Sequence, residues 1–248
     1  MSKENEIVKN YLFFCYNHLM ENKLNLYVSL AKMFKTKGFG LFLVGGTVRD
    51  ILLHHELDDM DLATDATPEE MKTILSEYKV DYTFAKFGSI KLIYEDVKFD
   101  ITTLRKENAY KDSRHPGNIE FVKELSIDVK RRDFTVNAMY MDLNFKLIDY
   151  VNGENDLNKG VLRMVGNADK RIIEDPLRII RAIRFSLTYN LTLDKELENS
   201  IFKNIKLVEK LNIKKVEQDI KKIKCSDKNK LAEMFTKFNI QHLLDVID

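Results

Sequence analysis

The sequence predicts an α+β protein, with a small mixed β-sheet and helices in residues 1–160 and an all-helical segment in residues 161–248. Two observations carry this prediction. Short apolar runs separated by turn residues recur between residues 39 and 143, as strands do. After Gly166 the apolar residues recur at helical spacing, and no alternation competes. Because 248 residues suit two modest domains, we predict a boundary near residue 160.

The first predicted elements are a helical lead-in and a strand–turn–helix unit. Residues 4–37 carry apolar side chains at roughly helical spacing, which predicts one or two helices. Residues 39–44 form a short apolar run that ends at Gly45 and Gly46, and residues 48–53 have helical character. A further helix begins near Thr67, which suits an N-cap, with Pro68 at the first helical position.

The remaining elements follow in order. Further strands are predicted around Asp61 and over residues 89–94, 97–103, 119–122 and 140–143. Beyond Gly166, successive helices are predicted over residues 171–187 and from residue 194 to the end.

Composition excludes several classes of protein. With 44% hydrophobic and 32% charged residues, the chain is too apolar to be disordered and too charged for a membrane bundle. No apolar run approaches the ~20 residues that span a bilayer, and the first residues lack the pattern of a secretion signal. We therefore expect a cytoplasmic protein without a membrane partner. The sequence assigns no oligomeric state.

Charge is balanced overall but not locally. The formal net charge is +1, so any preference for nucleic acid must come from a local patch. Residues 203–230, here called the basic segment, hold ten lysines and four acidic residues. Each lysine that contacts a phosphate would add salt-sensitive, sequence-independent affinity for RNA. A solvated helix face is the competing interpretation of this segment.

Three carboxylates are candidate metal ligands. Asp59 and Asp61 stand two residues apart, so on a strand they project from the same face. Like charges this close repel each other, and a bound divalent cation relieves the repulsion. Mg²⁺ with a nucleotide is the obvious candidate. On the strand 97–101, Asp100 faces away from the apolar residues and is a possible third acid. A D-x-D pair alone is more often structural, so the claim depends on its context.

That context is the upstream segment 43–50, which contains a glycine turn. A strand that ends in Gly45 and Gly46 lets the backbone approach a ligand closely, and the following helix points free N–H groups at it. Arg49 is placed to add charge-assisted hydrogen bonds to phosphate. The segment matches neither the G-x-G-x-x-G fingerprint nor the Walker motif, so it predicts a phosphate cradle of another kind.

Three motifs together resemble a known family, the class II tRNA nucleotidyltransferases and bacterial poly(A) polymerases of the polymerase β superfamily. They occur in the family's order and cover about residues 38–190. The catalytic signature is Gly45-Gly46-x-x-Arg49-Asp50 with Asp59-x-Asp61, the ribose-recognising signature is Arg131-Arg132-Asp133-Phe134-Thr135-x-Asn137-Ala138, and the base-templating signature is Glu174-Asp175-x-x-Arg178-x-x-Arg181-x-x-Arg184.

The resemblance implies a role for each matching residue. It implies two Mg²⁺ ions held by Asp59 and Asp61, with Asp100 as the third catalytic acid. The residues that it implies for nucleotide binding are Gly45, Gly46 and Arg49 for the triphosphate, Arg132 and Asp133 for the nucleotide, and Asp175, Arg178, Arg181 and Arg184 for the base. An aspartate that only accepts and an arginine that only donates can together read one base edge. The competing interpretation, favoured for an isolated helix, is that Arg178, Arg181 and Arg184 form a solvated stripe.

The resemblance also implies a fold and an activity. Residues 1–160 would be a polymerase β-type nucleotidyltransferase head, and residues 161–248 a helical neck and the start of a body. The implied enzyme adds CCA, or the terminal A, to the tRNA 3′ end from CTP and ATP and releases pyrophosphate. An intact loop at residues 105–130, with Tyr110 and Arg114, favours terminal A addition.

Two alternatives stay open at this point. A poly(A) polymerase of the same fold shares the signatures. A truncated, non-catalytic RNA-binding protein belongs to another class, and the paired acids count against it.

Overall fold

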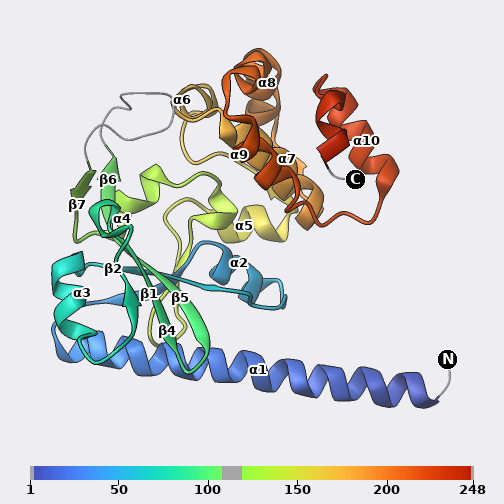
Figure 1. The fold of residues 1–248 in the computed structure, drawn as a ribbon. Coiled ribbons are helices and arrows are strands. Elements are labelled where there is room, and N and C mark those ends of the chain that lie inside the picture. Colours follow the sequence, from blue (N-terminus) through green and yellow to red (C-terminus); the bar gives the residue numbers. More distant parts are fainter. Residues whose placement is uncertain (1–2, 108–118, 247–248) are drawn as a thin grey trace. The chain divides into compact units, whose positions relative to one another are not determined.

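The chain forms two compact units in a computed structural model that describes residues 3–107 and 119–246 (Figure 1). The first unit combines Met1–Arg105, Phe121–Asp128 and Met139–Ile148; the second combines Lys106–Glu120, Val129–Ala138 and Asp149–Asp248. Each unit is therefore built from three separate stretches of chain. The predicted boundary at residue 160 concerns the family's domains and stays a prediction.

The described residues contain ten α-helices and five short 3₁₀ helices. The α-helices are α1 Lys3–Thr36, α2 Gly46–Leu52, α3 Pro68–Ile74, α4 Leu125–Asp128, α5 Gly153–Asn158, α6 Ala168–Glu174, α7 Leu177–Tyr189, α8 Lys195–Asn204, α9 Ile213–Ile220 and α10 Lys228–Lys237. The 3₁₀ helices are η1 Ala85–Phe87, η2 Val129–Arg131, η3 Thr135–Asn137, η4 Ile205–Lys210 and η5 Gln241–Val246.

A seven-stranded mixed sheet organises the first unit. Its order is β3-β4-β5-β2-β1-β8-β9, in which only β2 and β5 run parallel. Its strands are β1 Leu41–Val44, β2 Met60–Thr64, β3 Val80–Asp81, β4 Ser89–Tyr94, β5 Val97–Thr103, β8 Tyr140–Met141 and β9 Leu147–Ile148. A separate pair is formed by β6 Arg105–Glu107 and β7 Ile119–Phe121. The predicted strands over 89–94 and 97–103 are confirmed.

Alternation along β5 explains the core of this unit. Val97, Phe99 and Ile101 are buried, and Asp100 lies between them on the opposite face. On α1, Tyr27 is fully buried, and its hydroxyl donates to the carbonyl oxygens of Leu41 (3.1 Å) and Met141 (3.3 Å). The single long helix α1 is thereby attached to two adjacent strands of the sheet.

The start of α3 follows the predicted cap. Thr67 Oγ1 accepts from the Glu70 N–H (3.3 Å), and the Glu70 carboxylate accepts from the Thr67 N–H (2.7 Å). This reciprocal capping box satisfies two helix-end N–H groups, with Pro68 at the first helical position.

Helices dominate the second unit, and one predicted helix is divided in two. Residues 171–187 contain the end of α6 and most of α7, which Asp175 and Pro176 separate. Proline has no N–H to donate and disfavours helical geometry in the residue before it. Asp175 accordingly has extended backbone angles, φ −145° and ψ 95°. Its Oδ1 accepts from the Leu177 N–H (3.2 Å) at the start of α7.

The prediction that residues 161–248 are all helical is wrong in one detail. Two-residue strands, β10 Val161–Leu162 and β11 Thr192–Leu193, form a parallel pair. The Thr192 N–H donates to the Gly160 carbonyl (2.7 Å), and the Asp194 N–H donates to the Leu162 carbonyl (3.0 Å). Two residues are too few to show alternation, so this pairing is set by tertiary contacts.

No helix within residues 3–107 or 119–246 is long and apolar enough to cross a membrane. The part of the predicted specificity loop at residues 108–118, which includes Tyr110 and Arg114, lies outside the described residues.

Candidate functional site

Two of the three candidate metal ligands lie side by side in the first unit. Asp61 on β2 and Asp100 on β5 are direct partners in the parallel pairing of these strands. Asp59 is exposed and lies one residue before β2, which begins at Met60. Asp59 and Asp61 therefore share a face only if the backbone at Asp59 continues in the direction of the strand. Met60, between Asp59 and Asp61, is fully buried.

The glycine turn adjoins this carboxylate pair. Gly45 has φ 65°, a left-handed conformation that glycine adopts without strain. A Cβ atom added at Gly46 would lie 3.6 Å from Asp61 Oδ2 and 3.4 Å from Arg49 Nη2. The structure therefore brings together the two halves of the catalytic signature, the glycine turn and Asp61.

Side chains of α2 hold this arrangement. Thr47 is buried, and its Oγ1 accepts from the Asp61 N–H (2.8 Å), which ties the start of α2 to β2. Arg49 is only 4% exposed. Its Nε and Nη2 donate to the Asp50 carboxylate at 3.0 and 2.9 Å, the bidentate geometry that arginine favours. Arg49 is thus fixed in place beside the glycine turn.

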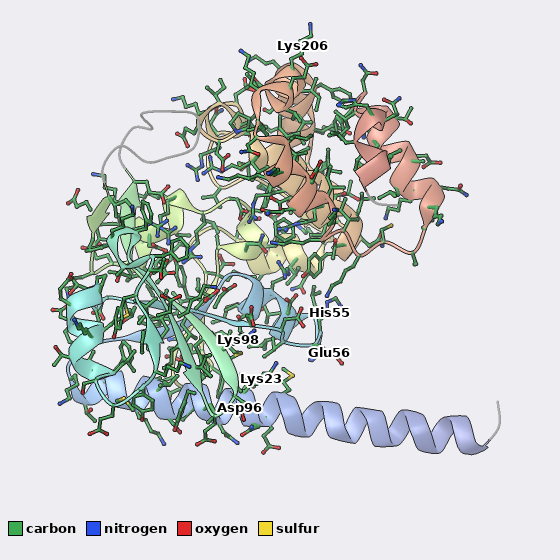
Figure 2. All side chains as sticks on the ribbon, in the orientation of Figure 1. Lys23, His55, Glu56, Asp96, Lys98 and Lys206 are labelled. Atoms are coloured by element: carbon green, nitrogen blue, oxygen red, sulfur yellow. The ribbon has the colours of Figure 1, made fainter. Side chains whose placement is uncertain are left out.

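Lys23, which no sequence motif contains, is hydrogen-bonded to the backbone of the segment that leads into β2. Lys23 on α1 donates to the carbonyl oxygens of Leu57 and of Asp58, the latter at 3.0 Å. Figure 2 shows Lys23 on α1, with His55 and Glu56 on the loop that leads into β2. No sequence signal marked Lys23, because its acceptors are backbone atoms that any residue would supply.

Asp100 also has a cation partner across the sheet. Lys91 on β4 pairs with Asp100 in register, and its Nζ lies 3.2 Å from Asp100 Oδ1. Both side chains are partly exposed, so this ion pair contributes little to stability.

The donor set of the first unit suits a hard divalent cation. Among the described residues, no group of three or more His, Cys, Asp or Glu side chains forms a metal site. Mg²⁺ is usually held by one or two carboxylates together with substrate phosphates and water, so a complete protein cage is not required. Asp61 with its neighbouring acids is consistent with that mode of binding.

In the second unit, the ribose-recognising and base-templating signatures contact each other. Arg181 on α7 donates from Nε (2.9 Å) and Nη2 (2.5 Å) to Asp133 Oδ2. Burial raises the pKa of Asp133, but the charge and hydrogen bonds of Arg181, the Phe134 N–H and the charge of Arg178 together outweigh burial and lower the pKa to about 2. Phe134 and Phe185 pack edge to face, with ring centroids 5.7 Å apart.

Arg178 is held close to Asp175, its predicted partner in base recognition. Its side chain is 6% exposed, and Nη1 donates to the Arg171 carbonyl (2.5 Å) and approaches Glu174 Oε2 (3.4 Å). The Arg178 N–H donates to the Asp175 carbonyl (3.1 Å). The helix break at Asp175 and Pro176 therefore holds both residues in one turn.

Arg184 ends the row of arginines in a separate ion pair. Its Nη1 lies 2.6 Å from Asp219 Oδ1 on α9, and both side chains are about nine-tenths buried. Arg184 also lies over the Phe185 ring at 4.5 Å. The arginines of α7 are therefore paired with acids rather than forming a solvated stripe. Asp219 was not predicted, because only the tertiary fold brings α9 to α7.

Arg132 lies directly after η2. Its N–H donates to the Val129 carbonyl (3.1 Å), and its own carbonyl accepts from Arg171 Nη2 (2.9 Å). The structure thus joins the segment Arg131–Arg132 to α6 through the backbone of the signature.

Comparison with known proteins supports the family resemblance. Residues 41–163 match the family model of the poly(A) polymerase head domain. Over these residues the chain is similar to that head domain. The matched residues include the glycine turn, the three carboxylates and Asp133, whereas the candidate base-templating residues follow them. The resemblance stated from the three signatures is confirmed.

Curated relatives and solved structures agree with this assignment. The chain is 40% identical over 194 residues to a CCA-adding enzyme of Lactobacillus johnsonii, covering 78% of this chain and 48% of the relative. A CCA-adding enzyme of Staphylococcus epidermidis is 38% identical, with the same coverage. The chain thus spans about half the length of the curated relatives that it matches.

Two similar structures hold ligands of their own. A Bacillus stearothermophilus CCA-adding enzyme in complex with CTP has a TM-score of 0.72 and 31% identity, covering 79% of this chain and 47% of that one. A Thermotoga maritima CCA-adding enzyme complexed with tRNA has a TM-score of 0.71 and 26% identity, covering 89% and 52%. The head-domain fold with its helical continuation is thereby confirmed.

Proposed function

We propose that this protein is a nucleotidyltransferase that adds CCA, or the terminal A, to the 3′ end of tRNA from CTP and ATP. The observation that carries the proposal is that Asp61 adjoins both Asp100 and the turn at Gly46 and Arg49. Acidic ligands beside a phosphate-binding turn suit phosphoryl transfer, which depends on positioning and electrostatic stabilisation. The relatives named CCA-adding enzymes support tRNA as the acceptor.

We further propose that the head domain works with two Mg²⁺ ions held by Asp59 and Asp61, with Asp100 as the third acid. When bound, such ions lower the barrier by neutralising charge on the attacking and leaving oxygens. The carboxylates would hold the ions. Thr47 Oγ1 accepts a hydrogen bond from the backbone N–H of Asp61 and so keeps Asp61 in position.

The remaining residues of the head domain bind the triphosphate. Gly45 and Gly46 leave space for phosphate close to the backbone, and Arg49 supplies fixed positive charge beside them. In the reaction the tRNA 3′ hydroxyl attacks the α-phosphorus of the nucleotide and releases its proton to water. The bond between the α-phosphorus and the bridging oxygen breaks, and pyrophosphate leaves.

Base choice falls to the second unit in this proposal. Asp175 offers only acceptors and Arg178 only donors, which together can read one base edge. Arg132 and Asp133 contribute nucleotide contacts. The ion pairs of Arg181 with Asp133 and of Arg184 with Asp219 hold α7 in place. We place the enzyme in the cytoplasm, because its proposed substrate is tRNA.

One assay tests the proposal. The protein is incubated with Mg²⁺, tRNA that lacks its 3′ CCA or only the terminal A, and each nucleoside triphosphate alone and combined, and the products are sequenced. We expect two cytidines and one adenosine, or one adenosine on tRNA ending in CC. Untemplated runs of adenosine would instead identify a poly(A) polymerase, which the family description favours as the second candidate. Tight tRNA binding without any addition would identify a non-catalytic RNA-binding protein.

A further inference from the structure

We propose that Arg171 is a positioning residue that locks the ribose-recognising segment Arg131–Arg132 to the base-templating segment Glu174–Arg178. No signature in the sequence contains Arg171. The inference rests on the proposed function, because it assigns these two segments to one bound nucleotide. Its physical basis is a set of contacts made by one side chain and its own carbonyl.

The Arg171 guanidinium reaches the ribose-recognising segment across 40 residues of sequence. Its Nη2 donates to the carbonyl oxygens of Arg131 (2.5 Å) and Arg132 (2.9 Å). Two neighbouring carbonyls on one nitrogen fix the backbone at this point. The direction in which the Arg132 side chain leaves the backbone is fixed with it.

Toward the base-templating segment, Arg171 acts through two other atoms. Its Nη1 donates to Glu174 Oε2 (2.5 Å), an oxygen that Arg178 also approaches at 3.4 Å. Its carbonyl oxygen accepts both from the Asp175 N–H (3.2 Å) and from Arg178 Nη1 (2.5 Å). Arg171 therefore contacts both of the residues proposed to read the base.

Burial makes arginine specific for this position. The Arg171 side chain is 11% exposed, and its Nε is buried without a hydrogen-bond partner among the described residues. A buried donor left unpaired is costly, so the bonds of the two terminal nitrogens must offset it. A planar guanidinium can point in two fixed directions at once, whereas a lysine ammonium is a single point charge. Lysine at this position can keep the charge but not both connections.

The test compares Arg171→Lys with Lys170→Met, its exposed neighbour on α6, in the full chain. Hydrogen–deuterium exchange is measured for residues 129–138 and 172–180, together with thermal unfolding. We expect Arg171→Lys to speed exchange in both segments while the protein remains folded. Lys170→Met should leave both segments at the wild-type rate. Unchanged exchange in Arg171→Lys, or a change in only one segment, would overturn the proposal.

A kinetic measurement separates positioning from a purely structural role. With CTP and UTP offered in turn, we expect Arg171→Lys to lose about tenfold or more of the discrimination between them, since displaced recognition groups lose orientation. The KM for the preferred nucleotide should change much less, because the triphosphate is bound by the head domain. Unaltered discrimination in an active variant would also overturn the proposal. If the wild type transfers no nucleotide, the proposed function fails, and the exchange data alone decide the role of Arg171.

Discussion

Arg181 and Asp133 form a two-bond ion pair that joins helix α7 to the segment proposed to recognise the ribose. Nε and Nη2 of Arg181 donate to the same carboxylate oxygen, at 2.9 and 2.5 Å. The partners stand 48 residues apart in sequence. The Asp133 side chain is 11% exposed, so removal of Arg181 would be costly, because it would leave a largely buried carboxylate without this partner.

This pair predicts how the stability of the protein depends on acid. The pKa of Asp133 is lowered from 3.8 to about 2 in the folded protein, so folding favours the charged form. Its contribution is therefore complete above about pH 4 and is lost as the pH falls toward 2. We expect the free energy of unfolding to fall less steeply over this range in Asp133→Asn than in the wild type. Parallel curves, measured by chemical denaturation, would show that Asp133 is not the titrating group.

The paired acids predict a loss of catalysis without a loss of fold. Asp59→Ala and Asp61→Ala should each reduce nucleotide transfer about a hundredfold or more, because metal-mediated charge stabilisation is worth several kcal/mol. Thermal unfolding should change little, since each substitution removes one of two repelling charges. Asp96→Asn is the control, an exposed acid in the turn between β4 and β5. Either variant retaining more than a few per cent of activity would exclude the two-metal assignment.

Base choice should depend on the residues at the break between α6 and α7. We expect Asp175→Ala and Arg178→Ala to blur discrimination of CTP and ATP from UTP and GTP more than they weaken triphosphate binding. Hydrogen bonds to a base edge carry identity, and phosphate contacts do not. Transfer assays with single nucleotides measure the first effect, and nucleotide-binding titrations measure the second. Selectivity that survives in both variants would place recognition elsewhere.

The basic segment gives a prediction about tRNA affinity. Lys214, Lys221 and Lys222 are exposed and Lys215 is half-buried. Changing these four lysines to glutamine should weaken tRNA binding and lower the slope of log affinity against log salt by about 0.7 to 0.9 for each lost phosphate contact. Nucleotide affinity should hardly change.

A variant with the same change of charge controls this experiment. Lys32, Lys35, Lys37 and Lys72 are exposed on the first unit and lie outside the basic segment. Their replacement by glutamine should leave the salt slope unchanged. Equal slopes for the wild type and both variants would instead favour a solvated helix face in the basic segment.

Local patterns in the sequence determined much of the fold. Alternation along residues 89–94 and 97–103 matched β4 and β5 because side chains on a strand point to opposite faces in turn. The cap at Thr67 and Pro68 is equally local, since its partners lie within one helical turn. The family also followed from the sequence, because its signatures are short segments with fixed spacing.

Only the tertiary structure decided which of these segments meet. Parallel pairing of β2 with β5 places Asp61 beside Asp100, and no spacing in the sequence specifies that register. Arg184 on α7 and Asp219 on α9 also form an ion pair that no spacing in the sequence specifies. The contacts of Arg171 could not be predicted from the sequence for another reason. Its main acceptors are backbone carbonyls, which every residue carries. Local patterns record which conformation a segment prefers, whereas long-range contacts depend on packing of the whole chain.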